Sequence, residues 1–95
     1  MADEALKQQV DHIVNTLEAG GDAMEYLEDS LEIEYYVSSD KQYRGARVLV
    51  AFGGPNIWID TKFKRVEGHW WGDSYSANYI DDMGLDDAIS ELFNC

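Results

Sequence analysis

The sequence predicts an α+β domain of two layers, in which a four-stranded antiparallel meander is covered on one face by helices, in the order ααββββα. Two observations support this prediction. Apolar residues recur at helical spacing near both ends of the chain, and they alternate with polar residues in the middle. The length of 95 residues limits the chain to one domain, residues 1–95, with one core.

The first helix is predicted over Ala2 to Glu18. Its apolar side chains recur every three to four residues and share one side: Leu6, Val10, Ile13, Val14 and Leu17. Gly20-Gly21 ends this helix, because glycine readily adopts the left-handed conformation that follows a helix C-terminus. Asp22 can cap a second, shorter helix that contains Met24 and Leu27.

Four strands are predicted in the middle of the chain. Leu31 to Ser38 alternates apolar and polar residues, as a half-buried strand does. Gly45 to Phe52 and Asn56 to Thr61 form a hairpin around Gly53-Gly54-Pro55, and Arg65 to Trp71 is the fourth strand.

The register is predicted by keeping apolar side chains on one face. The expected cross-strand pairs are Phe52 with Ile57, Val50 with Ile59, Ile59 with Val66, and Ile57 with Gly68. The core face then contains Val48, Val50, Phe52, Ile57, Ile59, Val66, Gly68 and Trp70. The outer face contains Arg47, Leu49, Ala51, Trp58, Asp60, Arg65, Glu67, His69 and Trp71.

The last helix is predicted to start near Gly84, with Asp86 and Asp87 in its first turn, where the helix dipole favours negative charge. Its buried residues are expected to be Leu85, Ala88, Ile89 and Leu92. Trp58, Trp71 and Tyr36 fall on the outer sheet face, where large aromatic side chains indicate either a contact surface or a cover. We expect the loop Ser74 to Met83 to provide that cover.

Acidic and basic residues are segregated along the chain, whose net charge is −12. Residues 1–40 hold eleven acidic residues and one basic residue, residues 41–65 hold six basic and one acidic, and residues 66–95 hold seven acidic and no Lys or Arg. Helices that cover one sheet face expose their polar sides away from it. We therefore expect an anionic helical surface and a nearly neutral outer sheet face, on which Asp60 pairs with Arg65 and Arg47 pairs with Glu34 or Glu32.

Several functional classes are disfavoured. The longest apolar run, Val48 to Phe52, is far too short to span a membrane, and the first 20 residues do not resemble a signal peptide, so a cytosolic location is expected. Cys95, the only cysteine, cannot form an internal disulfide or a cysteine-based zinc site with His12 and His69. Six cationic side chains between residues 41 and 65 cannot offset nineteen acidic ones, so direct nucleic-acid binding is not expected.

No motif indicates catalysis. Gly53-Gly54-Pro55-Asn56 lacks the following lysine and helix of a phosphate-binding loop and is interpreted as a hairpin turn. His69 has no clear nucleophile or orienting carboxylate, although Asp60 is a candidate. Asp60 and Glu67 resemble a glycosidase pair only superficially, and the stretch DDMGLDD lacks the spacing of a calcium loop. We expect no enzyme activity, metal or cofactor.

Three stretches, GGPNIWIDT, VEGHWWGD and the ending GLDDAISELFNC, make the C-terminal half similar to small acidic proteins carried by phages and mobile elements of Firmicutes. The resemblance implies an inhibitor of host defence of the anti-CRISPR or anti-restriction kind, several of which mimic DNA. It provides no catalytic or binding motif.

We therefore predict a non-enzymatic inhibitor in the host cytoplasm that binds a basic, nucleic-acid-binding surface of a CRISPR effector or restriction nuclease. The acidity could instead serve solubility alone. Two other functions are open: an oligomeric module that uses the aromatic sheet face, and a hydrolase or ligand-binding domain with a pocket near His69. The residues predicted to bind the partner are Glu18, Asp22, Glu25, Glu28, Asp29, Trp58, Trp71, Asp81, Asp82, Asp86 and Asp87.

Overall fold

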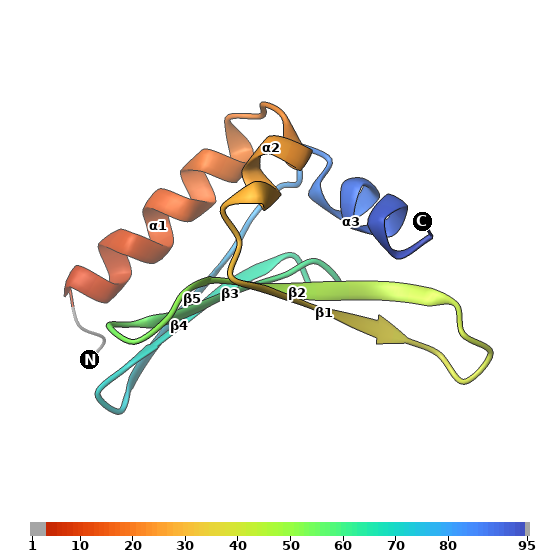
Figure 1. Cartoon of the computed structure of the whole chain (residues 1–95). Helices are drawn as coiled ribbons and strands as arrows, with labels where there is room; N and C mark the ends of the chain where they lie inside the picture. The colour runs from red at the N-terminus through yellow and green to blue at the C-terminus, as the bar shows by residue number, and fades with distance from the viewer. Residues whose placement is uncertain (1–3, 95) are drawn as a thin grey trace.

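The computed structural model describes residues 4–94, so Ala2, Asp3 and Cys95 lie outside the described residues. Its elements are α1 (Glu4–Glu18), α2 (Ala23–Glu28), β1 (Glu32–Val37), β2 (Tyr43–Ala51), β3 (Asn56–Asp60), β4 (Arg65–Trp70), β5 (Asp73–Asn78) and α3 (Leu85–Phe93). The strands form one antiparallel sheet in the order β1-β2-β3-β4-β5, and the helices lie over one face of it (Figure 1). The α+β class is confirmed, but the predicted count of four strands is wrong.

The additional strand, β5, comes from residues that the sequence predicts to be a loop. It pairs with β4 from Trp70 opposite Asp73 onward. The two residues between them, Trp71 and Gly72, have φ angles of 53° and 82°. Positive φ at both central residues is the signature of a type I′ hairpin turn. Ser74 to Asn78 therefore extend the edge of the sheet, and Tyr79 joins the core, so the prediction that the segment Ser74 to Met83 covers the outer face is wrong.

The predicted register is confirmed for one hairpin and wrong for the other. Ile59 pairs with Val66 and Ile57 with Gly68, as expected. Across β2 and β3, however, the pairs are Val48 with Ile59 and Ala51 with Ile57. A bulge between Leu49 and Ala51 shifts the ladder there, because it sets two residues of one strand against one of its partner. Phe52 consequently lies beyond the end of β2 and is 73% exposed instead of belonging to the core.

The core lies between the helices and the inner sheet face. Its largest fully buried side chains are Leu6, Leu17, Ile57, Ile59, Leu85, Ile89, Val10, Val48, Val66 and Thr61. Trp70 packs against this cluster, as predicted. On α3, Leu85, Ala88 and Ile89 are buried as expected, but Leu92 is 37% exposed, which contradicts its predicted burial.

The first strand is less covered than its alternating sequence indicates. Ile33 packs against the core, whereas Leu31, Tyr35 and Val37 are exposed. The strand is at the edge of the sheet, so the helices reach only part of its inner face.

Glycine at position 68 lets α1 approach the sheet closely. A Cβ atom there would lie 2.7 Å from Leu6 Cδ1 and 2.9 Å from Val10 Cγ2. Both of these side chains are completely buried, so neither has free space into which to move. The helix α1 therefore packs directly against the backbone of β4.

The caps of the two shorter helices are made by aspartates. Asp22 Oδ1 accepts a hydrogen bond from the backbone N–H of Glu25, which confirms its predicted role as the α2 cap. Asp81 accepts from the backbone N–H groups of Leu85 and Asp86 at 2.7 and 3.1 Å and so satisfies the start of α3. Each helix in residues 4–94 is too short or too polar to cross a membrane.

We predict that Gly68→Ala lowers the free energy of unfolding by about 1–3 kcal/mol, because the added methyl group overpacks the contact with α1. Chemical denaturation monitored by circular dichroism measures the change. Gly54→Ala is the control, because nothing lies within 4 Å of a Cβ at that position. Equal stabilities for the two variants would contradict this account of the packing.

Candidate functional site

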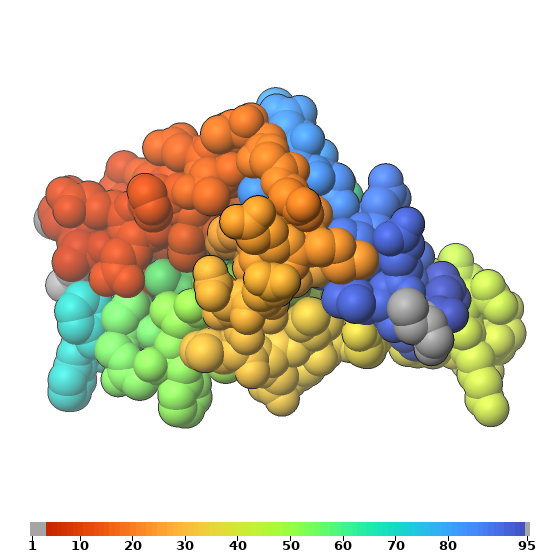
Figure 2. All heavy atoms as spheres, turned by 45° about the horizontal axis from the view of Figure 1, so that its top comes forward, coloured from red at the N-terminus to blue at the C-terminus, as the bar shows by residue number. Residues whose placement is uncertain are grey.

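The exposed carboxylates gather on α2, on α3 and on the turns beside them. We call this group the α2–α3 acidic surface; its members are Asp22, Glu25, Glu28, Asp29, Asp82, Asp87 and Glu91, all of which are exposed. The two helices contact each other and lie side by side at the surface in Figure 2. Residues 19–31 and 80–94 contain no Lys or Arg. No Lys or Arg within these two segments therefore neutralises the carboxylates of this surface.

A shallow hollow of about 270 Å³ lies on this surface beside α2. Asp22, Glu25 and Asp29 line it together with Tyr26 and Met83. Burial raises the pKa of Tyr26 above its ordinary value, and its hydroxyl, like that of any tyrosine at neutral pH, is protonated and can donate a hydrogen bond. Within residues 4–94, no group of three or more acidic, histidine or cysteine side chains has the arrangement of a metal site.

Besides Asp22, which caps α2, three of the predicted partner-binding carboxylates accept hydrogen bonds within the chain. Glu18 Oε2 accepts a hydrogen bond from the backbone N–H of Ile80 at 2.9 Å. Asp81 caps α3, and Asp86 lies partly buried between that helix and the sheet. The structure therefore places these three apart from the freely exposed carboxylates of the α2–α3 acidic surface.

The prediction that α1 contributes a freely exposed acidic side also needs correction. Asp11 is bonded to Lys7 Nζ at 2.8 Å, and it accepts a hydrogen bond from the Tyr75 hydroxyl of β5. The hydrogen bond from Lys7 lowers the pKa of Asp11. Together with the bond between Glu18 and Ile80, this contact ties α1 to the β5 side of the sheet. The anionic surface is consequently shorter than the helical layer.

Asp86 joins α3 to the sheet through two hydroxyl groups. Its Oδ1 accepts hydrogen bonds from Tyr43 at 2.6 Å and from Thr61 at 2.9 Å. Burial raises the pKa of Tyr43, and the hydrogen bond to Asp86 raises it further. The same effects, burial first and then the bond to Asp60, raise the pKa of Tyr36 to about 12.

The aromatic side chains on the outer sheet face are largely occupied by neighbours. The Arg47 guanidinium carbon lies 3.8 Å from the centre of the Trp58 ring, which is a close cation–π contact. Arg47 also bonds Glu34 at 3.0 Å, as the sequence predicts. Tyr36 donates to Asp60. Trp58 and Tyr36 are therefore half-buried, and they do not form a bare aromatic patch.

The predicted pairing of Asp60 with Arg65 is only partly observed. These residues are opposite each other in the ladder, but Arg65 Nε lies 2.8 Å from Glu67 Oε1 in an ion pair that lacks hydrogen-bond geometry. Asp60 Oδ1 instead accepts from the backbone N–H groups of Lys62 and Phe63. It therefore fixes the β3–β4 turn.

Trp71 is the most exposed of the large apolar side chains, at 90%. It was predicted to lie on the outer face of a strand, but it occupies the first position of the β4–β5 turn. The dipeptide Trp-Gly between two polar segments is a weak turn signal, because a type I′ turn normally has Asn or Asp before the glycine. Phe52, exposed at the neighbouring β2–β3 turn, was missed because the bulge was not foreseen.

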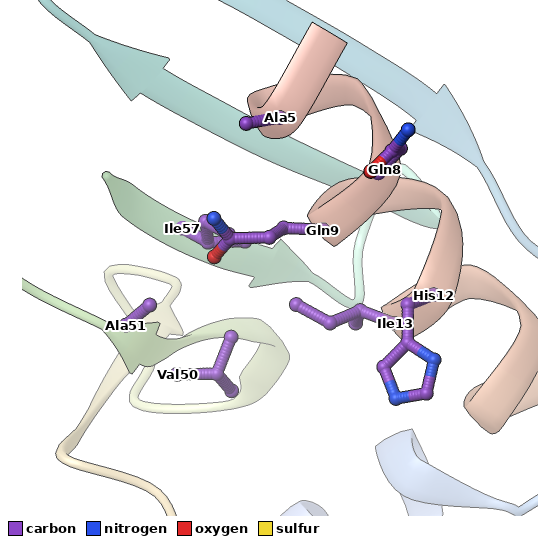
Figure 3. Close-up of a pocket in the computed structure, with 8 residues that line it drawn as sticks. All are labelled: Ala5, Gln8, Gln9, His12, Ile13, Val50, Ala51 and Ile57. Carbon is purple, nitrogen blue, oxygen red and sulfur yellow. The ribbon is translucent and has the colours of Figure 1, made fainter. Parts of the chain in front are cut away.

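An inner-face pocket lies between α1 and the ends of β2 and β3 (Figure 3). Its volume is about 410 Å³, and its apolar floor is made by Ile13, Val50, Ala51 and Ile57. Gln8, Gln9 and His12 form the polar part of its lining, and Gln9 extends from α1 toward Ile57 in Figure 3. No Ser, Thr, Cys, Lys, Asp or Glu side chain lines this pocket.

No protein-family model matches the chain, and neither the curated proteins nor the solved structures contain a match.

The buried tyrosines predict a loss of stability in alkali. Burial raises the pKa values of Tyr36, Tyr43 and Tyr79 above the ordinary value of about 10. Below about pH 10 these groups are protonated in both states, and their contribution to stability is complete. Above it the unfolded chain loses protons first, so the free energy of unfolding falls as the pH rises toward about 12.

Denaturant unfolding between about pH 9 and pH 12, with tyrosinate absorbance recorded in parallel, measures this effect. Tyr36→Phe removes one of the three groups and should make the decline shallower. A stability that does not change over this range would contradict the burial of these hydroxyls.

We predict that Trp71→Asn stabilises the protein by about 1 kcal/mol. The left-handed conformation costs an ordinary residue about 1–2 kcal/mol, and Asn-Gly is a favoured type I′ pair. The indole is almost fully exposed, so its removal sacrifices little burial. The melting temperature should rise by about 4–8 °C. Trp71→Ala also removes the ring, but alanine does not tolerate the left-handed conformation as asparagine does, so its gain in stability should be smaller. An equal gain in stability for the two variants would show that backbone strain is not the cause.

Proposed function

We propose that this chain is a non-enzymatic inhibitor that binds a basic surface of a nucleic-acid-binding protein through the α2–α3 acidic surface. The observation that supports this proposal is the concentration of seven exposed carboxylates over two helices in segments that contain no Lys or Arg. Like charges so placed repel one another. A cationic partner relieves that repulsion when it binds.

The charge density on α2 is comparable to that of a nucleic-acid strand. Asp22, Glu25, Glu28 and Asp29 lie within eight residues, whose seven helical rises correspond to about 10 Å along a helix. One strand of a duplex places a phosphate about every 3.4 Å. Four carboxylates over this length therefore provide an anionic row of the required density, and a phosphate-binding groove can bind them in place of nucleic acid.

The acidic surface is also held rigidly. The caps made by Asp22 and Asp81 fix the starts of both helices. Asp86 is bonded to Tyr43 and Thr61 of the sheet, while Leu85 and Ile89 are completely buried. A preorganised surface loses little conformational entropy on binding, and its excess charge speeds association with a basic partner.

The class of partner follows from the resemblance to phage and mobile-element proteins. We propose a CRISPR effector or a restriction nuclease inside the host cell. The alternative, an oligomeric module built on the aromatic sheet face, is less favoured because Trp58 is stacked under Arg47 and the Tyr36 hydroxyl is bonded to Asp60. Trp71 is exposed, but it belongs to the β4–β5 turn, and that turn lies at the opposite end of the sheet from α3 (Figure 1).

We predict that the triple variant Glu25→Gln, Glu28→Gln, Asp87→Asn weakens inhibition of the target nuclease by about 10- to 100-fold. Each exposed charge contributes up to about 1 kcal/mol, and 1.4 kcal/mol corresponds to a factor of ten. These residues are exposed and are not the capping aspartates. DNA cleavage by Cas9 with its guide RNA and by purified restriction nucleases, at about 50 and 200 mM salt, measures inhibition and its salt dependence.

The control variant, Glu4→Gln, Glu32→Gln, Asp40→Asn, changes the net charge equally at exposed positions outside the α2–α3 acidic surface. It should inhibit nearly as well as the wild-type chain. Equal losses in both triple variants would mean that only net charge matters, and inhibition that is insensitive to salt would contradict nucleic-acid mimicry.

A further inference from the structure

Two adjoining hollows lie on the outer sheet face beside the β4–β5 turn. One of about 360 Å³ is lined by Asn56, Trp71 and Asp73, and one of about 310 Å³ by Arg65 and Glu67. They share His69 and Ser74 in their linings, so they adjoin and are treated together as one depression. Each volume is at the lower end of the range for small-molecule sites. We call this depression the β4–β5 hollow.

Trp71 stands at the rim of this hollow in a conformation that costs energy. Its φ of 53° is in the left-handed region, which L-residues other than glycine, Asn and Asp rarely occupy. Exposure of 90% means that packing provides almost no compensation. Strained residues cluster at ligand sites, and of Lys41, Lys64 and Trp71, the non-glycine residues with positive φ in residues 4–94, Trp71 is the one that lines this hollow.

The lining favours a neutral ligand with many hydroxyl groups. Asp73 and Glu67 oppose an anion, and Arg65, the cation in the lining, is already paired with Glu67. A nucleotide would also bring its phosphate toward a chain of net charge −12. An apolar ligand would leave the carboxylates, imidazole and hydroxyl unsolvated without partners. Sugar hydroxyls donate and accept hydrogen bonds and carry no charge, so they can bond to both the donors and the acceptors in the lining.

The hydrogen-bonding groups required by such a ligand are present. Asn56 Oδ1 accepts from the backbone N–H of Gly53 at 3.1 Å, which leaves the side-chain nitrogen to donate. Asp73 accepts only, and Ser74 does both. Beside them, the flat indole of Trp71 offers an apolar surface to the C–H face of a pyranose ring, because an aromatic ring is apolar over its faces and polar only at the N–H.

We propose that the β4–β5 hollow binds a neutral saccharide, with one sugar ring stacked on Trp71 and its hydroxyl groups bonded to Asn56, Asp73 and Ser74. This site is independent of the proposed inhibitor function. It lies on the outer sheet face, whereas α2 and α3 cover the inner one (Figure 1). Its failure would leave the acidic-surface proposal unaffected, and the reverse is also true.

The test is a titration of the ¹⁵N-labelled full chain with four neutral probes: cellotetraose, maltotetraose, mannotetraose and chitotetraose. At least one should shift the Trp71 indole N–H signal and the backbone signals of His69 and Ser74, with a Kd of about 1 mM or tighter. Trp71→Asn, which preserves the turn, should weaken that binding at least tenfold. If no probe shifts these signals at about 10 mM, the proposal is wrong.

Phe52→Ala provides the matched control, because Phe52 is an exposed aromatic residue at the neighbouring turn that does not line the hollow. It should bind the saccharide as the wild-type chain does. Equal weakening in the Phe52 and Trp71 variants would indicate nonspecific aromatic contact and overturn the site. Inorganic phosphate that shifted the same signals at equal concentration would overturn the argument for a neutral ligand.

Discussion

The close contact between α1 and Gly68 of β4 determines how the helices are arranged on the sheet. Leu6 and Val10 occupy the space that a Cβ atom would need at position 68, so the helix axis can lie unusually near the backbone of the strand. In this position α1 covers β4 and β5, while α3 packs on β2. The two halves of the inner face are thus covered by separate helices, and α2, which follows α1 in the chain, contacts α3.

Because every helix lies on the inner face of the sheet, polar side chains on the outer face must find their hydrogen-bond and ion-pair partners on that same face. Arg47 does so twice, by bonding Glu34 and by lying over the Trp58 ring. Asp60 also serves two elements, since it fixes the β3–β4 turn and accepts from Tyr36 on β1. Cross-strand pairs of this kind stabilise a sheet that is open on one side. In the β4–β5 hollow, Arg65 and Glu67 also pair with each other, beside the Trp71-Gly72 turn.

The elements with strong periodicity were predictable, and those decided by single residues were not. The three helices and the inner-face residues of β3 and β4 follow from apolar spacing, because a long periodic segment buries one face wherever it lies. The bulge near Leu49 and the Trp71-Gly72 turn depend on local backbone choices that leave little trace in composition. The helices that carry the acidic site were predictable, but which carboxylates stay exposed was not. Glu18, for example, accepts a hydrogen bond from the Ile80 N–H, and Ile80 is placed there by β5, a strand that the sequence did not reveal.

The separation of charge makes the molecule electrostatically asymmetric. Carboxylates near the sheet are compensated by helix N-termini, hydroxyls or Lys7, so they stabilise the fold. Those on the α2–α3 acidic surface have no cation in their own segments, because six of the seven basic residues lie between positions 41 and 65. Net negative charge is therefore concentrated in the segments that contain α2 and α3. A basic partner would be steered to that side, which leaves the outer sheet face and its hollow free for an uncharged ligand.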